Sequence, residues 1–175
     1  DVDVPTTVDC LVAAKAHKGC SIVECLVNCV IFNNGTHAWI ADRELRAEHS
    51  IILKHGQKMI FGKNNDKGLA VEIDPVTFVP KMIVVPAGDP RVLTHDATQP
   101  DPTLHRLLSL MGQNLVTDVN TLPTEDSLPI ALGVIRSVEA ETYDEAVNKQ
   151  IADVREHAKA HNFDELTATL ESWQV

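Results

Sequence analysis

The fold is decided by the stretch Gly19-Cys20-Ser21-Ile22-Val23-Glu24-Cys25-Leu26-Val27. The eight residues after Gly19 are mostly apolar and lie between turn-forming residues, a pattern typical of a buried strand. Before them, Thr6 begins a capping box that predicts a helix to about Lys18, which Gly19 is well placed to end. Helix, glycine and buried strand form the second half of a βαβ unit, so we expect an α/β fold whose first strand precedes residue 1.

The middle of the chain predicts a small antiparallel sheet. Residues 28–35 are rich in Asn and Gly and indicate a loop, and residues 38–50 indicate a short helix. Short apolar runs then alternate with turn residues, as in a series of hairpins. We expect strands at 51–53, 59–61, 69–73 and 78–85.

The last third of the chain predicts helices joined by long connections. Residues 86–102 hold four of the nine prolines and indicate an extended segment. The sequence further predicts a helix from Asp101-Pro102 to about Met111, a loop over 112–129, a strand over 130–138, a helix from Thr142 to about Lys159, and a short helix with a tail over 164–175. The fold class is therefore α/β: a partial parallel-sheet domain over residues 1–35, followed by an α+β extension over residues 36–175.

Composition and charge exclude several classes of function. The chain of 175 residues has a formal net charge of −10, which argues against binding to nucleic acid or to an anionic membrane surface. No apolar run approaches the roughly 20 residues of a membrane-spanning helix. The chain opens on acidic residues and has no initiator Met, so we expect no signal peptide and a start inside a longer protein. Three of the four cysteines lie close together, unlike a secreted disulfide framework, and we expect a cytoplasmic location.

The four cysteines match no standard spacing for zinc or for a ferredoxin. On a strand, Cys20 and Cys25 point to opposite faces and cannot easily share a metal, while Cys10 lies on the preceding helix. For these three, a role as small buried apolar side chains is the simpler interpretation. Cys29 differs, because it lies just past the carboxyl end of the expected strand, where ligands of parallel sheets bind.

A set of motifs in fixed order carries a resemblance to a known family. His17-Lys18-Gly19-Cys20-Ser21-Ile22-Val23-Glu24 and Asn28-Cys29-Val30-Ile31-Phe32-Asn33-Asn34-Gly35 resemble segments of the beta subunits of 2-oxoacid:ferredoxin oxidoreductases. The resemblance continues at His55-Gly56-Gln57-Lys58-Met59-Ile60-Phe61-Gly62, Asp66-Lys67-Gly68, Leu132-Gly133-Val134-Ile135-Arg136, Thr142-Tyr143-Asp144 and Ser172-Trp173-Gln174-Val175. It covers nearly the whole chain and corresponds to the C-terminal half of the subunit.

The resemblance implies a site at Cys29, the position of the fourth ligand of a 4Fe–4S iron–sulfur cluster. It implies that the other three ligands, and the motif for Mg²⁺ and thiamine diphosphate, lie earlier in the subunit; no Gly-Asp-Gly motif occurs here. Residues 1–35 then end the thiamine-diphosphate-binding domain. Asn28 and Asn33 would tune the cluster through hydrogen bonds near the sulfur, although both are also ordinary turn formers.

The resemblance also implies a reaction and its partners. The intact enzyme decarboxylates a 2-oxoacid oxidatively to the acyl-coenzyme A and passes the electrons through the cluster to ferredoxin, with an alpha subunit as partner. Asn28 before the cysteine favours the 2-oxoglutarate branch, because pyruvate-type enzymes tend to have Pro there. Val27 stands where Gln is common, and Asn34 replaces the usual Asp. We expect this chain alone to be inactive; the alternative is a non-catalytic interaction module with inert cysteines.

Overall fold

The computed structural model describes residues 2–32, 34–36, 38–112 and 127–157. The chain divides into two compact units, Asp1–Glu139 and Ala140–Val175. The domain boundary expected after residue 35 stays a prediction.

The first helix begins three residues earlier than the sequence pattern predicts. Helix α1 spans Val4–Ala16, and Asp3 is its N-cap. The Asp3 carboxylate accepts a hydrogen bond from the Thr6 backbone N–H at 3.2 Å and another from the Thr6 hydroxyl at 2.9 Å. An Asp cap satisfies free amides of the first turn, so Thr6 becomes a helical residue and not the cap. No residue of α1 is buried.

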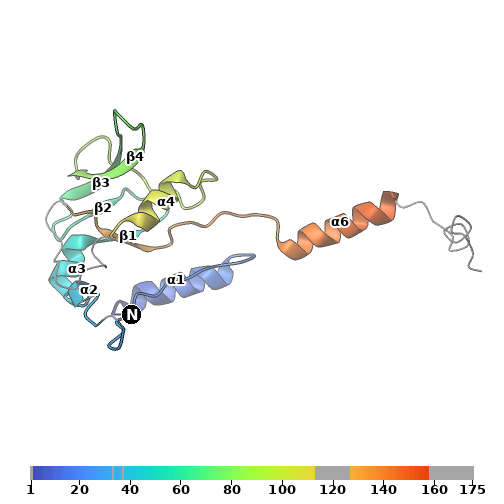
Figure 1. Ribbon diagram of the computed structural model, residues 1–175, viewed down its shortest axis with the longest axis horizontal. Helices are drawn as coiled ribbons and strands as arrows, with labels where there is room; N and C mark the ends of the chain where they lie inside the picture. Colours follow the sequence, from blue (N-terminus) through green and yellow to red (C-terminus); the bar gives the residue numbers. More distant parts are fainter. Residues whose placement is uncertain (1, 33, 37, 113–126, 158–175) are drawn as a thin grey trace, which may run out of the picture. The chain divides into compact units, whose positions relative to one another are not determined.

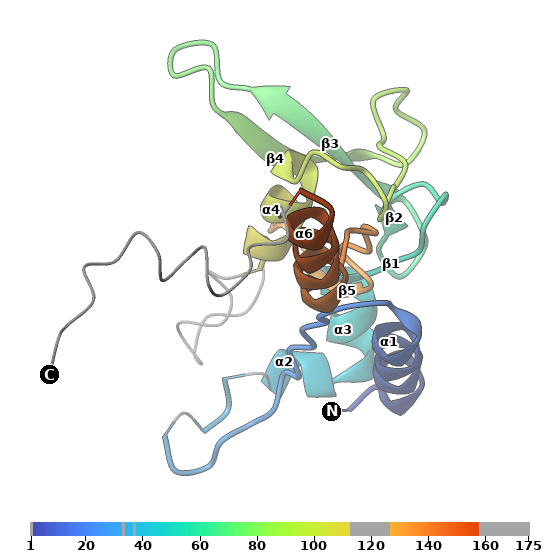
Figure 2. The same ribbon diagram turned by 90° about the vertical axis from the view of Figure 1, so that its right-hand side faces the viewer.

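The expected buried strand over residues 20–27 is wrong. These residues form no strand, and nearly all of their side chains are exposed, Ile22 to 92%. Figure 2 shows them as the irregular ribbon that follows α1. The physical reason is that a strand needs a hydrogen-bonded neighbour along at least one edge, and the described residues pair no strand with this segment. Leu26 alone is anchored, against a small cluster formed by Trp39, Ile40 and Ile130.

The helix predicted over residues 38–50 is present in two pieces, α2 at Ala38–Ala41 and α3 at Arg43–His49. The interruption is Asp42, whose carboxylate accepts hydrogen bonds of 2.9 Å from the backbone N–H groups of Glu44 and Leu45. Asp42 therefore acts as the N-cap of α3 and begins a new helix.

A parallel pair of strands crosses the first unit, but its strands differ from those expected. Strand β1, Ser50–Leu53, pairs in parallel with β5, Ile130–Gly133, from Ser50 opposite Ile130 to Leu53 opposite Gly133. The run at 51–53 was expected in the antiparallel sheet, which is wrong, and the strand predicted over 130–138 ends at Gly133. Gly133 has φ +94°, and a Cβ there would lie 2.8 Å from the Leu53 carbonyl oxygen. Only glycine fits this close approach.

The small antiparallel sheet that the sequence predicts is confirmed. Strands β2 (Ile60–Phe61), β3 (Lys67–Ile73) and β4 (Pro80–Pro86) lie in the order β2-β3-β4. Figure 1 shows β3 and β4 as the long green hairpin. Neighbouring Leu69 and Ala70 are both fully buried, so β3 is covered on its two faces.

The helix predicted from Asp101-Pro102 to about Met111 is also confirmed, as α4 at Thr103–Leu110. The Asp101 carboxylate accepts a hydrogen bond of 2.8 Å from the Thr103 N–H at its start. Leu108 of α4 is fully buried in the main core cluster together with Leu69 of β3. The core thus lies between α4 and the hairpin sheet.

The second unit contains helix α6, Tyr143–His157, which opens with the predicted capping box. The Glu145 side chain accepts from the Thr142 N–H at 3.0 Å, and the Thr142 hydroxyl accepts from the Glu145 N–H at 3.4 Å. No residue of α6 is buried. The helix and tail predicted over residues 164–175 lie outside the described residues. No helix in the described ranges has the length and apolar character to span a membrane.

Candidate functional site

The loop that carries Cys29 is closed by its neighbour. The Asn28 side-chain oxygen accepts a hydrogen bond of 2.8 Å from the Gly35 N–H, and its amide donates to the Asn34 side-chain oxygen at 3.1 Å. Gly35 has φ +84°, a conformation that glycine adopts without strain. These contacts make Asn28 the residue that joins the two ends of the loop. A role of Asn28 toward the sulfur stays a prediction, and Asn33 lies outside the described residues.

The Cys29 side chain is exposed, and none of the four cysteines forms a disulfide. Cys20 and Cys25 are exposed as well, so the expectation that they are buried apolar side chains is wrong. Cys10 is half-buried, and burial together with the nearby Asp9 carboxylate raises the pKa of its thiol. The described residues contain no group of three or more His, Cys, Asp or Glu side chains placed to hold a metal ion. The role of Cys29 as a cluster ligand stays a prediction.

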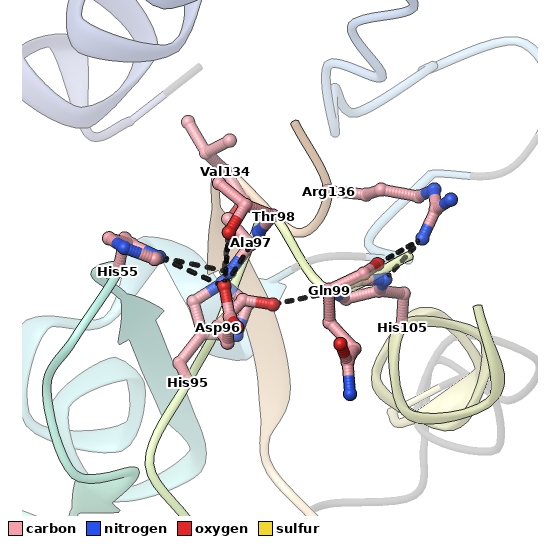
Figure 3. A network of polar contacts seen from close by, with 9 residues as sticks. All are labelled: His55, His95, Asp96, Ala97, Thr98, Gln99, His105, Val134 and Arg136. Atoms are coloured by element: carbon pink, nitrogen blue, oxygen red, sulfur yellow. Dashed lines mark hydrogen bonds and ion pairs between the residues drawn. The ribbon is translucent and has the colours of Figure 1, made fainter. Parts of the chain in front are cut away.

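A second polar arrangement, which the sequence analysis did not identify, surrounds His105 of α4 (Figure 3). His105 is 3% exposed, and its Nε2 lies 2.8 Å from the Asp96 carbonyl oxygen. Its Nδ1 lies 2.8 Å from the Arg136 guanidinium. The same guanidinium donates to the carbonyl oxygens of Gln99 at 2.9 Å and Pro100 at 3.0 Å. Arg136 therefore joins the segment after β5 to the loop before α4.

His95 lies beside this arrangement and is 1% exposed. Its Nε2 lies 2.9 Å from the Val134 carbonyl oxygen, while its Nδ1 is buried and has no hydrogen-bond partner among the described residues. The rings of His95 and His105 meet edge to face, with centroids 6.2 Å apart. Burial lowers the pKa of His95, and the nearby His105 lowers it further. His95 is therefore held as a neutral imidazole.

At the exposed edge of the arrangement, Asp96 is bound by its own loop. Its carboxylate accepts from the Thr98 hydroxyl at 2.7 Å and the Thr98 N–H at 2.9 Å, which lowers the pKa of Asp96. His55 Nδ1 lies 3.3 Å from the Asp96 carboxylate and accepts from the Ala97 N–H at 3.3 Å. His55 and Arg136 fall inside motifs of the family resemblance. No sequence pattern pairs them with His95 or His105, because the contacts join residues far apart in the chain.

A shallow apolar pocket of about 240 Å³ lies between α4 and the β3–β4 hairpin. Its wall is formed mainly by apolar side chains, with polar groups at one end. The lining residues are Val71, Pro80, Gln99, Asp101, Thr103, Leu104 and Leu107. Asp101 is the one titratable residue of this lining, and its carboxylate accepts the hydrogen bond from the Thr103 N–H at the start of α4, so we assign the pocket no chemistry.

Comparison with known proteins finds one curated relative. The chain is 32% identical over 165 residues to the 2-oxoglutarate oxidoreductase subunit KorB of Mycobacterium tuberculosis. The match covers 90% of this chain and 38% of the relative, so the chain spans well under half of the relative's length. No family model and no solved structure matches the chain. The match confirms that this chain resembles the C-terminal part of the beta subunits of the 2-oxoacid oxidoreductases.

Proposed function

We propose that this chain is part of the beta subunit of a 2-oxoglutarate:ferredoxin oxidoreductase, and that Cys29 binds an iron–sulfur cluster in the complete enzyme. The similarity to the 2-oxoglutarate oxidoreductase subunit along 90% of the chain carries the proposal. The complete enzyme would convert a 2-oxoacid and coenzyme A to an acyl-coenzyme A. The electrons would pass to ferredoxin, and an alpha subunit would complete the assembly.

The environment of Cys29 fits a ligand of a shared cluster. Its thiol is exposed on a loop that Asn28 and Gly35 close, so the sulfur is accessible without unfolding of the loop. One thiolate supplies one of the four bonds that a 4Fe–4S cluster needs, and the remaining ligands would come from the rest of the subunit. Asn28 would hold the loop in place, and its amide would help to orient Cys29.

The exposed apolar side chains of residues 2–32 support a missing covering layer. Eleven large apolar side chains between residues 2 and 32 are exposed, a density that is unusual on the surface of a complete domain. They are Val2, Val4, Val8, Leu11, Val12, Ile22, Val23, Val27, Val30, Ile31 and Phe32. In the complete subunit these residues would pack against the domain that binds thiamine diphosphate and Mg²⁺, as the end of that domain.

When bound, thiamine diphosphate and the cluster supply the decarboxylation chemistry and the one-electron transfers. The described residues would position one sulfur atom and present the exposed apolar side chains of residues 2–32 to the rest of the subunit. The sequence has no diphosphate motif, and the described residues contain no group of three or more side chains placed to hold a metal ion, so we expect this chain alone to have no 2-oxoacid-dependent activity.

Co-expression with the remaining part of the subunit tests the proposal. The assembled protein should be brown and should contain four iron atoms per subunit, the content of one 4Fe–4S cluster. Cys29→Ser should remove the colour and most of the iron. Cys25→Ser is the matched control, because Cys25 is equally exposed and lies four residues earlier in the chain. The control should keep the colour.

Two results would overturn the proposal. One is an assembled protein whose iron content is the same with Cys29→Ser as with Cys25→Ser. The other is reduction of ferredoxin by the isolated chain with a 2-oxoacid and coenzyme A, which would contradict the expected inactivity. A colourless assembly that lacks iron altogether would favour the non-catalytic interaction module.

A further inference from the structure

The five residues that follow β5, Val134 to Val138, are hydrogen-bonded to three other segments of the first unit. We call this segment the strap. Along the chain it leads toward Ala140, where the second unit begins. Its hydrogen bonds join Val134 O to His95 Nε2 at 2.9 Å, Arg136 to Gln99 O, Pro100 O and His105 Nδ1, Ser137 N to Ala97 O at 2.7 Å, and Val138 O to His17 Nε2 at 3.2 Å.

The contacts of His105 require one neutral tautomer. The Asp96 carbonyl oxygen can only accept, so Nε2 of His105 carries the hydrogen and donates. The Arg136 guanidinium can only donate, so Nδ1 of His105 must accept. A proton on Nδ1 would replace this acceptor with a donor. It would also place a positive imidazolium directly against a positive guanidinium, and the contact would be lost.

His95 is also constrained to its neutral form, in this case by burial of a ring nitrogen. Its Nε2 must donate to the Val134 carbonyl oxygen, so Nδ1 is the nitrogen that remains for a second proton. That nitrogen is buried and has no acceptor in the described part of the chain. A charged His95 would therefore leave a buried N–H without a partner, which is strongly unfavourable.

We propose that protonation of His95 or His105 releases the strap. The strap stays hydrogen-bonded to the loop 95–100 and to His105 while both imidazoles are neutral, and it detaches when either one is protonated. Detachment would give the connection to the second unit more conformational freedom. The device is independent of the iron–sulfur site, because none of its residues belongs to the Cys29 loop.

The charged groups that face the two histidines come from every segment around them. His105 and His55, from the loop after β1, oppose a positive charge on His95, and the Arg136 guanidinium from the strap lies against Nδ1 of His105. Asp96 favours the charged form of His95, and Asp101 lies near His105. Both carboxylates are already bound by their own loops, to Thr98 and Thr103. For His95 the net effect is a lowered pKa, so the folded state loses stability as the pH falls below about 6.5.

Hydrogen exchange of the full chain tests whether the strap is released at low pH. The reporter is the Ser137 amide, which donates to Ala97 O, and amides of β3 are the internal reference. After correction for the intrinsic exchange rate, protection of Ser137 should fall several-fold between pH 7.5 and pH 5.5, because the folded state with a lowered His95 pKa loses stability as the pH falls. Protection in β3 should change much less. An equal loss in both places would overturn the proposal, since it would indicate global unfolding.

Variants test whether the two histidines cause the pH dependence. His95→Gln keeps a donor near the Nε2 position, and His105→Asn keeps an acceptor near Nδ1, yet neither residue can be protonated at these pH values. The double variant should lose the pH dependence at Ser137. Arg136→Ala should release the strap at both pH values, while the control Arg91→Ala, at an exposed arginine paired with Asp89, should leave it fastened.

If the double variant does not fold, the histidine signals of the unchanged chain can be followed by NMR. Proton uptake at His95 or His105 should coincide with the loss of protection at Ser137. The proposal is overturned if either histidine is protonated while Ser137 stays protected. It is equally overturned if the double variant folds and retains the full pH dependence.

Discussion

The N-terminal region, residues 2–32, and the hairpin region, residues 58–112, use apolar side chains in opposite ways. In the N-terminal region α1 has no buried residue, and the segment after it exposes Ile22, Phe32 and most of their neighbours. In the hairpin region β3 is covered on two faces, and Leu69 and Leu108 are fully buried. The exposed N-terminal region has the higher apolar fraction of the two, so composition does not explain the difference.

The difference lies in where the partners of each region are found in the chain. The strands β2, β3 and β4 are sequence neighbours, and α4 follows them in the chain, so the hairpin region supplies its own sheet and most of its core, to which Ile51 and Leu53 of β1 also contribute. The N-terminal region forms a helix from local interactions, but the described residues provide no neighbouring strand for residues 20–27. Local pairing therefore makes a region self-sufficient, whereas apolar residues that depend on distant partners remain exposed.

Leucine-to-alanine substitutions should give the largest contrast between the two regions. Leu108→Ala removes a fully buried side chain from α4 and should lower the free energy of unfolding by about 2–5 kcal/mol. Leu11→Ala is the matched control, since Leu11 lies on helix α1 and is 50% exposed; its effect should stay within about 0.5 kcal/mol. Urea denaturation followed by circular dichroism measures both. Equal losses would mean that the N-terminal region is packed in solution.

A glycine substitution at the parallel pair tests how tightly the two distant strands meet. Gly133→Ala combines a positive φ with a Cβ placed 2.8 Å from the Leu53 carbonyl oxygen, and should cost about 1–3 kcal/mol. Gly88→Ala is the control, because it has an ordinary φ and nothing within 4 Å of the added Cβ. Thermal unfolding of the two variants gives the comparison. A neutral Gly133→Ala would show that β1 and β5 are not held together in solution.

The sequence predicts the locally determined parts of this fold and misses the parts that distant residues decide. The hairpin strands, α4 and the capping box at Thr142 follow from alternation, turn residues and caps within a few residues. The parallel pairing of β1 with β5 could not be predicted, because nothing in the sequence of residues 50–53 indicates which segment pairs with them. The run 20–27 has the composition of a buried strand, but composition does not supply a neighbouring strand.

The candidate sites divide in the same way. Cys29 was identified from a resemblance carried by motifs close together in the chain, and the match to a curated relative supports that resemblance. The arrangement around His105 could not be predicted, because His95, His105 and Arg136 lie on three separate segments and meet only in the folded chain. No spacing between these residues resembles a known motif.

The ion pair between Lys67 and Glu48 should contribute less to the free energy of unfolding than Leu108 or Gly133 does. Their side chains are only 18% and 30% exposed, and Glu48 also accepts a hydrogen bond of 3.0 Å from the Lys63 N–H. Glu48→Gln should cost about 1 kcal/mol. Glu72→Gln, in the more exposed pair with Lys81, should cost less than about 0.5 kcal/mol. Chemical denaturation at pH 7 measures both variants.

The acid dependence of this pair follows from its pKa. The hydrogen bond from Lys67, and then that from the Lys63 N–H, hold the pKa of Glu48 below its ordinary value. The stabilisation is therefore complete above the ordinary pKa and is lost as the pH falls below about 4.3 through the folded-state pKa. Glu48→Gln should flatten this part of the pH–stability curve. An unchanged curve would show that the pair does not form in solution.

The smallest expected effect is a difference in cysteine reactivity within the N-terminal region itself. Cys10 is half-buried on α1 and has a raised pKa, so less of it is thiolate at pH 8 than of an exposed cysteine. Alkylation followed by peptide mass spectrometry should therefore label Cys10 several-fold more slowly than Cys20 or Cys25, both of which are exposed. Faster labelling of Cys10 would contradict its placement against the rest of the unit. In the assembled subunit, labelling of Cys29 should also become slow, because cluster binding and the covering domain would remove its thiol from solvent, while the rate for Cys10 would change less.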